Sequence, residues 1–396
     1  MTTTTLRPNA ALVLAAGFVV LFVGGGARFV VGLNFKPMVD ELGWLRSDLG
    51  LAVFVFQVVS ATATFWAGKL ADRISLRTLL LSGLLISGAG IGLMAIVTVP
   101  WHAILFYGVI FAVGTGMSSV SPVGVMVTRV YPGRAGFANG VAVSGMSAGQ
   151  FFIIAGLAGV LVLIGWRSVY VWAAVAFVVL VPLLYPLIPP DKGNSTTGMA
   201  PATGMSLRDA ARTRQFWILL AVFLLCGIDD FFVTTHVAAF AQDRGMDVFF
   251  AGNLLAAMGL TGLIGVIGAG MLADRAGPRS PVAWSFVARI FAFGLIALDQ
   301  SAVSIAIFTI VFGLTFMVTA PLTILFVRDA FGLRNLGAIA GLITMVHQVG
   351  GGLGAYLGSI LFDARGSYDL AFVTMLVVSI VALGLTMMLK RMPMRA

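Results

Sequence analysis

Long apolar runs alternate with short polar turns along the whole chain. Twelve runs of about 20 residues or more can be recognised, and a helix needs roughly 20 residues to cross about 30 Å of hydrocarbon. The runs begin near Asn9, Arg46, Arg77, Trp101, Arg134, Ser168, Gln215, Asp247, Arg279, Ser301, Asn335 and Asp369. The pattern therefore predicts an all-α membrane protein with twelve transmembrane helices.

The apolar pattern contains an internal repeat. A ten-residue segment that begins at Gly68, GKLADRISLR, returns 202 residues later at Gly270 as GMLADRAGPR, and each copy lies between two apolar runs. The same offset relates Glu41 to Asp243. Repeats that share an orientation are how many secondary transporters build two halves around a central site. We therefore expect two six-helix bundles related by pseudo-two-fold symmetry.

Composition supports a lipid environment. Apolar residues make up 60% of the chain and charged residues 10%, whereas average chains carry roughly a quarter charged residues. The net charge of +9 could suggest a nucleic-acid partner, but seventeen of the 24 basic residues fall on the side of the N-terminus, and five fall on the other side. By the positive-inside rule the majority side is the cytoplasm. We expect cytoplasmic termini, a lipid bilayer as partner and no nucleic acid.

A polar linker separates the two halves. The stretch from Asp191 to Met205 is rich in Gly, Ser and Thr, which is typical of a flexible linker. The basic segment 206–217 that follows predicts a short interfacial helix leading into the seventh span. We expect an N-terminal bundle over residues 1–188, a cytoplasmic linker over 189–212 and a C-terminal bundle over 213–396.

Residues for catalysis are sparse. The single cysteine, Cys226, lies inside an apolar run, and the three histidines are scattered. The sequence contains no metal-spaced ligand set and no phosphate-binding loop with a lysine. We therefore expect no enzyme, no metal or other cofactor and no ATP-driven pump. A sensor that binds its ligand without moving it is the alternative within the non-enzymatic classes.

The repeated box, the six-plus-six arrangement and the central linker resemble the major facilitator superfamily. The resemblance implies the fold of that superfamily. It also implies that the acidic and basic residues of the two boxes form cytoplasmic ion pairs that latch the outward-facing state, and the alternative is that these charges only fix the topology. The residues concerned are Asp72, Arg73, Arg77, Asp274, Arg275 and Arg279.

Shorter stretches look like the monocarboxylate-porter side of the superfamily and its bacterial relatives. They are residues 43–46, 133–150, 165–167, 235–236, 347–348 and 366–368. The resemblance implies a small organic anion as substrate, a monomer and a bacterial inner (plasma) membrane location. Animal monocarboxylate transporters carry an Asp and an Arg in span eight, where this chain has Gly262 and Val266. An anion-binding arginine must therefore lie elsewhere, or the substrate differs.

Arg28 is the first candidate for that arginine. A charge within the hydrocarbon costs at least about 2.5 to 3.5 kcal/mol, so each one is by default a functional candidate. Arg28 precedes Lys36, which marks the outer end of span one, by eight residues, or about 12 Å. The repeat offset makes Asp230 its counterpart in the second half. We predict that Arg28 binds a substrate carboxylate, and an Arg28–Asp230 ion pair without ligand is the alternative.

Two acidic residues in span seven are candidates for proton coupling. Asp229 and Asp230 lie roughly 20 Å from the outer end of the span. His236 follows Asp229 by seven residues, so both side chains lie on one helix face and are expected to reach the same cavity. Carboxyl and imidazole groups are suited to carrying a proton. Asp229 is our proton-site hypothesis with Asp230 as its rival, and packing near the interface is the alternative for His236.

Further intramembrane polar residues complete the set. Besides Arg28, the predicted substrate contacts are Asp230, His236, Gln150 and His347. His347 lies near the middle of span eleven, where packing is the alternative. Arg289 lies ten residues into span nine, an outer helix in the superfamily fold, so no cavity role is predicted for it although it must find a partner.

The leading functional hypothesis is a secondary transporter that takes up a small organic anion, monocarboxylate-like, together with a proton. It rests on Arg28 and on the acidic pair. The rival is uptake or efflux of a larger aromatic or cationic compound through the same fold, in which Asp229 and Asp230 would recognise the substrate.

Overall fold

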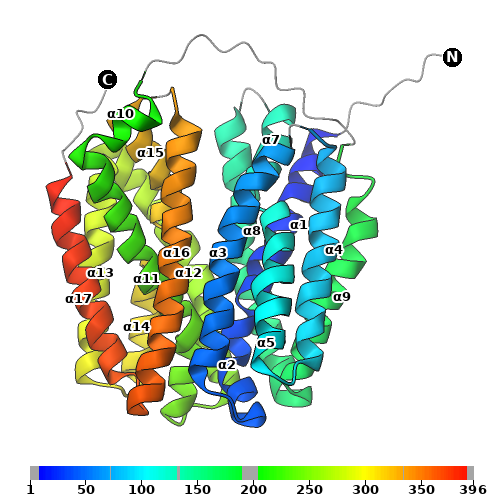
Figure 1. Ribbon diagram of the computed structural model, residues 1–396, viewed down its shortest axis with the longest axis vertical. Coiled ribbons are helices and arrows are strands. Elements are labelled where there is room, and N and C mark those ends of the chain that lie inside the picture. The colour runs from blue at the N-terminus through cyan, green and yellow to red at the C-terminus, as the bar shows by residue number, and fades with distance from the viewer. Residues whose placement is uncertain (1–8, 72, 132–133, 190–203, 333, 390–396) are drawn as a thin grey trace.

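The computed structural model describes residues 9–71, 73–131, 134–189, 204–332 and 334–389, and these residues are almost entirely helical (Figure 1). Eleven helices are long and apolar enough to cross a membrane. The predicted tenth span is the shorter helix Ala302–Phe316 together with the helix that follows it. All twelve predicted starts lie within two residues of an observed helix start. The protein is an integral membrane protein.

The first six spans form one bundle. Three of them are built from more than one helix: α1 and α2 meet at Phe29, the short η1 continues α4, and the fourth span contains a π-helical segment, η2. The helices are α1 (Ala10–Arg28), α2 (Val30–Leu42), α3 (Arg46–Leu70), α4 (Leu76–Leu93), η1 (Met94–Ile96), α5 (Pro100–Ala103), η2 (Ile104–Phe111), α6 (Ala112–Met117), α7 (Val120–Val130), α8 (Ala135–Ile164) and α9 (Trp166–Leu184).

The last six spans form the second bundle. The helices are α10 (Leu207–Ala211), α11 (Arg214–Asp243), α12 (Val248–Ala276), α13 (Arg279–Leu298), α14 (Ala302–Phe316), α15 (Thr319–Phe331), α16 (Leu336–Arg365) and α17 (Asp369–Met388). The short α10 begins in the segment where an interfacial helix was predicted, and Ser206 caps it by accepting from the Asp209 backbone N–H at 3.1 Å. The Ser206 hydroxyl also lowers the pKa of Asp209. Residues 190–203 of the predicted linker lie outside the described residues.

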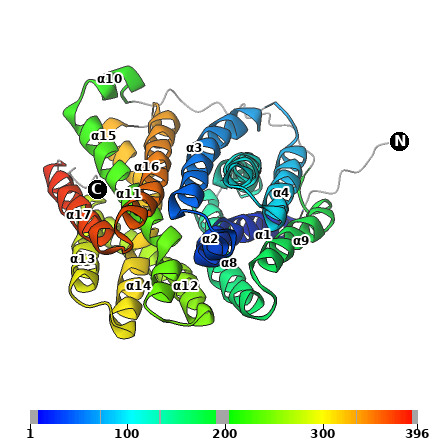
Figure 2. The same cartoon turned by 60° about the horizontal axis from the view of Figure 1, so that its bottom comes forward.

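The two bundles stand side by side, and three helix pairs make most of the contact between them (Figures 1 and 2). These pairs are α3 with α16, α8 with α12, and α2 with α11. We call the end at which α1 begins and α17 ends the terminal end, which is at the top of Figure 1. The opposite end, at which α2 ends, α3 begins and α16 ends, is called the sealed end because ion pairs join the bundles there.

The sequence repeat is visible in the turns of the sealed end. Gly43 follows α2 with a φ of 65°, and Gly245 follows α11 with a φ of 82°. A residue with a Cβ rarely adopts this left-handed conformation, so glycine is favoured at both turns. The 202-residue offset thus relates two turns that both contain a glycine in the left-handed conformation.

Candidate functional site

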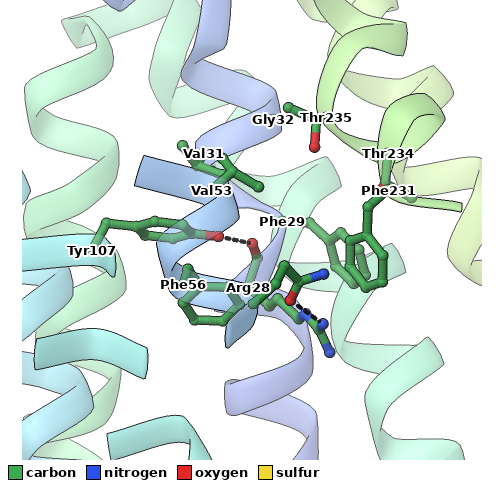
Figure 3. Close-up of a pocket in the computed structure, with 11 residues that line it drawn as sticks. Arg28, Phe29, Val31, Gly32, Val53, Phe56, Tyr107, Phe231, Thr234 and Thr235 are labelled. Carbon is green, nitrogen blue, oxygen red and sulfur yellow. Dashed lines mark hydrogen bonds between the residues drawn. The ribbon is translucent and has the colours of Figure 1, made fainter. Parts of the chain in front are cut away.

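A cavity lies between the bundles where α1 ends (Figure 3). In this conformation the space left free is about 10 Å³, roughly the room that one water molecule needs. The N-terminal bundle contributes Arg28 and most of the apolar lining, and α11 of the other bundle closes the remaining side. The lining residues are Arg28, Phe29, Val31, Gly32, Val53, Phe56, Gln57, Tyr107, Phe231, Thr234 and Thr235.

Arg28 is fixed at the base of this cavity by both its backbone and its side chain. It is the last residue of α1, beside the break at Phe29, and the Tyr107 hydroxyl donates to its carbonyl at 3.0 Å. Its Nη2 donates to Gln57 Oε1 at 2.6 Å. The guanidinium carbon lies 5.6 Å from the centre of the Phe56 ring and 4.6 Å from that of Phe231, within the range of cation–π attraction. Arg28 therefore lines the cavity, and its predicted role in binding a carboxylate stays a prediction.

Two hydrogen-bond donors at this site have no acceptor. Arg28 Nε and Gln57 Nε2 are buried, and neither has a partner among the described residues. A buried polar group left unsatisfied costs about 1 to 3 kcal/mol, and more when it is charged. Two adjacent orphan donors, one of them cationic, match a ligand that presents acceptor oxygens, such as a carboxylate.

A second group of charges lies inside the C-terminal bundle and centres on Arg289. Its side chain is fully buried, and its Nη2 lies 2.6 Å from Asp230 Oδ1 and its Nη1 3.9 Å from Asp229 Oδ2. The guanidinium also donates to the Thr315 hydroxyl at 3.1 Å and to the Cys226 carbonyl at 3.3 Å. Arg289 thus comes from α13 and serves both acidic residues, a role that its position in the sequence did not indicate.

The Arg28–Asp230 pair considered from the sequence is not formed. Asp230 is held by Arg289 and by His347, whose Nε2 lies 3.1 Å from Asp230 Oδ2, while Arg28 bonds to Gln57. The offset that relates Arg28 to Asp230 describes equivalent depth, but Arg28 points into the cavity between the bundles, whereas Asp230 points into the C-terminal bundle.

Phe231 lies between the two charged groups. Its ring centre is 4.6 Å from the Arg28 guanidinium carbon and 6.2 Å from the centre of the His347 ring. The His347 side chain is 18% exposed, whereas Asp230 and Arg289 are buried. His347 is therefore the partly exposed member of the Asp230 group.

Asp229 lies in the most enclosed position of the group. Its Oδ2 accepts from the Ser379 hydroxyl at 2.7 Å, and its Oδ1 is buried with no partner among the described residues. One guanidinium serves two carboxyl groups here, so a second ionised carboxylate would lack a counter-charge of its own.

His236 does not share a cavity with Asp229, and this part of the prediction is wrong for this conformation. His236 is buried at the sealed end, where Nε2 contacts the Ala355 carbonyl at 2.8 Å and Nδ1 contacts the Tyr368 hydroxyl at 2.9 Å. The helix face is shared, as the spacing predicts, but it faces α16 and α17 rather than the cavity. Ser379, which donates to Asp229, belongs to α17, and Tyr368, which contacts His236, is the N-cap of the same helix.

Gln150 contributes to packing between the bundles. Its Nε2 donates to the Leu255 carbonyl at 3.1 Å, where α8 meets α12, and its side chain is buried. It is outside the lining of the described cavity. In this conformation Gln150 joins helices rather than facing the Arg28 site.

Two basic residues of the boxes donate side-chain hydrogen bonds, and each bond lies within one bundle. Arg77 Nε donates to the Ile188 carbonyl at 2.7 Å, and Arg279 Nη2 donates to the Met387 carbonyl at 2.5 Å. Arg73, Asp274 and Arg275 are exposed. Asp72 lies outside the described residues. The described part of the boxes therefore does not join the two bundles in this conformation.

Three potential metal ligands come together at Asp230. The donor atoms of Cys226, Asp230 and His347 lie within 4.8 Å of one another. Arg289 already supplies a cation to this carboxylate, and the Cys226 thiol donates to it at 3.6 Å. The group is therefore better suited to holding a proton than to holding a metal ion.

Twelve helical spans in two bundles, with buried charges beside a central cavity, define a membrane transporter. The profile described as Major Facilitator Superfamily matches residues 17–354 and 228–395. The chain belongs to the major facilitator superfamily.

Relatives and a solved structure support the same assignment. The chain is 25% identical over 403 residues to an uncharacterised MFS-type transporter, YcxA, of Bacillus subtilis (strain 168), and the match covers 95% of this chain and 94% of that protein. It is 24% identical over 345 residues to monocarboxylate transporter 13 of Rattus norvegicus, and the match covers 86% of this chain and 77% of that protein. The crystal structure of a mutant of the nucleoside transporter NupG superposes with a TM-score of 0.81 at 14% sequence identity. The superposition covers 96% of this chain and 99% of that one.

Proposed function

We propose that this transporter carries a small organic anion, monocarboxylate-like, together with a proton by alternating access. The observation that carries the proposal is the pair of orphan donors, Arg28 Nε and Gln57 Nε2, at the base of the central cavity. A carboxylate would accept from both and would balance the guanidinium charge. The partial identity to monocarboxylate transporter 13 agrees with an anionic substrate.

The proposed orientation makes the terminal end cytoplasmic, because most basic residues fall on that side of the spans. The structure then corresponds to an inward-facing state, in which ion pairs close the outer, sealed end. The boxes would form their latch in the opposite, outward-facing state. The moving units are the bundles 1–188 and 213–396, connected by the linker 189–212 in the cytoplasm of a bacterial inner membrane, and each monomer works alone.

The proposed proton site is the group around Arg289. One guanidinium faces two carboxyl groups, so adding or removing one proton changes the charge of a buried site. A proton from the cavity side reaches His347, which is in contact with Asp230, and is then held by the Asp229–Asp230 pair. The Phe231 ring lies next to both Arg28 and His347. Binding of the anion at Arg28 and of the proton at His347 would therefore both affect the position of this ring.

The rival substrate classes fit this arrangement less well. A cationic compound would need a free carboxylate, whereas both acidic residues lie against Arg289. An aromatic compound finds support in the four aromatic residues that line the cavity, namely Phe29, Phe56, Tyr107 and Phe231. An anion with an aromatic portion therefore remains within the proposed class.

Counterflow in proteoliposomes tests the anion site. Vesicles loaded with an unlabelled carboxylate and diluted into the same labelled carboxylate should accumulate label with the parent protein. Arg28→Gln keeps a polar side chain but removes the charge, and we expect about a hundredfold loss of transport because a hydrogen bond to a charged group contributes up to roughly 3 kcal/mol. Arg28→Lys should retain part of the activity, because it keeps the charge without the fork.

The matched control is Arg208→Gln, an exposed arginine on α10 that lies outside the cavity and the two boxes. Its counterflow of the same carboxylate should be close to that of the parent. Carboxylate counterflow of Arg28→Gln at the parental rate would overturn the assignment of the anion site.

A further inference from the structure

At the sealed end a continuous chain of hydrogen bonds joins the two bundles and ends on His236. Arg46 Nη1, from α3, donates to the Tyr368 hydroxyl at 2.6 Å. The same hydroxyl lies 2.9 Å from His236 Nδ1 on α11. His236 Nε2 lies 2.8 Å from the Ala355 carbonyl on α16.

The chemistry of these groups fixes two of the bond directions and favours the third. A carbonyl only accepts, so His236 Nε2 carries the hydrogen that is donated to Ala355. A guanidinium only donates, so the Tyr368 oxygen accepts from Arg46 and its own hydrogen is available for His236 Nδ1. With each hydroxyl and ring hydrogen used once, Nδ1 is the acceptor and the imidazole is neutral.

Protonation of His236 is incompatible with this chain. A second hydrogen on Nδ1 would face the hydrogen of the Tyr368 hydroxyl. Tyr368 would have to turn its O–H away and accept from two cationic donors, His236 and Arg46. The contact between α11 of one bundle and α3 of the other would be lost or weakened.

The chain is part of a larger seal between the bundles. Asp363 at the end of α16 accepts from the backbone N–H groups of Arg46 at 3.0 Å and Ser47 at 2.8 Å. These are orphan donors at the start of α3, so a carboxylate of the other bundle caps this helix. Asp243 of α11 also pairs with Arg46 at 2.7 Å and with Lys36 of α2 at 3.2 Å.

Every element packed around His236 contributes a group that matters to its protonation. The cationic groups are Arg46 from α3 and Lys36 from α2, and the acidic groups are Asp243 on α11 and Asp363 on α16, all beyond the Tyr368 ring or at the rim of the seal. The direct neighbours are the Tyr368 and Ser359 hydroxyls, the Ala355 carbonyl and the Phe35 ring, whose centre lies 4.9 Å from the imidazole. No carboxylate contacts the imidazole among the described residues, so the closed seal offers an imidazolium no direct counter-ion.

We propose that His236 is a proton-operated release of the seal: the closed end requires a neutral His236, and proton binding at Nδ1 favours opening of that end. In the proposed orientation this end faces the outside, so external acid would favour the state that takes up substrate. The switch differs from the proton site around Arg289, because it controls access rather than carrying the coupling charge. It rests on the proposed function only for the side of the membrane from which the proton comes.

The expected size of the effect follows from linkage. A solvated imidazole titrates near pH 6.5, and the closed state excludes its charged form. Between pH 7.5 and pH 5.5 the ratio of open to closed molecules should then rise by about tenfold. Any protonation of His236 in the closed state would make this change in the ratio smaller.

The opening can be measured by pulsed electron paramagnetic resonance between spin labels on the two bundles. Leu45, just before α3, and Arg365, at the end of α16, are both exposed, and Cys226 is buried, so labels on L45C and R365C report the sealed end. The parent should have one short distance at pH 7.5 and gain a longer one at pH 5.5, without any substrate present. H236Q should lose this response to pH.

Two further variants keep the test decisive. H102Q removes a histidine on α5 whose ring contacts Thr98 of the same bundle at 3.4 Å, and it should respond to pH as the parent does. Y368F removes the hydroxyl whose hydrogen conflicts with a protonated Nδ1, so its response should also be lost, and it covers the case in which H236Q does not fold. A parent with no pH response, or an undiminished response in both H236Q and Y368F, would overturn the proposal. Counterflow of Arg28 variants is independent of either result.

Discussion

At the residue scale, the molecule is defined by a few buried charges and by which of them find partners. Arg289 is fully buried, yet it has two carboxyl groups, a hydroxyl and backbone carbonyls around it. Arg28, in contrast, keeps one unsatisfied nitrogen. A buried charge whose hydrogen-bonding groups all have partners needs no ligand, whereas a buried charge with an unpaired donor is suited to bind one. The contrast supports the proposed division between a proton site around Arg289 and a substrate site at Arg28.

Sequence reasoning identified the depth of these residues but not their pairing. Arg28, Asp229 and Asp230 could be found because charges are rare in apolar runs. Arg289 was visible by the same signal, but helix order along the chain does not tell toward which neighbour a side chain points. Gln57 was missed as the partner of Arg28, although a lone glutamine in the adjacent span was the available signal.

Asp229 provides a residue-scale prediction. If it holds the coupling proton, Asp229→Asn should lose uptake driven by a pH gradient while keeping carboxylate counterflow, because exchange needs no net proton movement. Both can be measured in the same proteoliposomes, with and without an inside-alkaline gradient. Asp209→Asn, at an exposed aspartate on α10, should retain both. Uphill uptake by Asp229→Asn with the parental pH dependence would exclude Asp229 as the proton site.

At the element scale, smooth helix faces position the charged residues. Along α16, Gly350 and Gly354 lie against the backbone carbonyls of Leu224 and Ile228 on α11. Small residues four apart let two helices approach closely where lipid gives no hydrophobic drive. This close approach brings His347 of α16 to Asp230 of α11. The glycine spacing was visible in the sequence, but which helix it faces was not.

Gly354 and Gly341 provide a matched comparison on one helix. A Cβ at Gly354 would lie against the Ile228 backbone, whereas a Cβ at Gly341 has nothing within 4 Å. We expect Gly354→Ala to lower the thermal stability of the purified protein, by roughly 1 to 3 kcal/mol for such overpacking, and Gly341→Ala to leave it unchanged. Fluorescence-detected size exclusion after heating measures both. Equal stability of the two variants would contradict the packing argument.

At the scale of the whole molecule, the seal and the cavity belong to one conformation. Ion pairs and the Asp363 cap hold the bundles together at the sealed end, while the described box residues at the terminal end bond within their own bundles. Alternating access requires that this distribution reverses. A transporter held at the sealed end should therefore bind substrate from one side only.

A disulfide across the seal tests that requirement. A Cβ added at Gly50 of α3 would lie 2.8 Å from the Ser359 Cβ of α16, and disulfides need about 3.5 to 4.5 Å, so a small shift accommodates the bond. The double variant G50C/S359C should lose counterflow on oxidation and regain it on reduction. The single variants G50C and S359C should be insensitive to both treatments. Full counterflow by the oxidised double variant would mean that the sealed end need not open.

The sequence by itself determined the membrane setting, the twelve spans, the internal repeat and the depth of Arg28, Asp229 and Asp230, because each depends on local length, charge or spacing. Only the tertiary structure decided the partners: Arg289 with the acidic pair, Gln57 with Arg28, and Tyr368 with His236. Apolar helices pack in many ways that satisfy the same hydropathy pattern. Which faces meet depends on close contacts between helices distant along the chain, and those contacts set the chemistry of every buried charge.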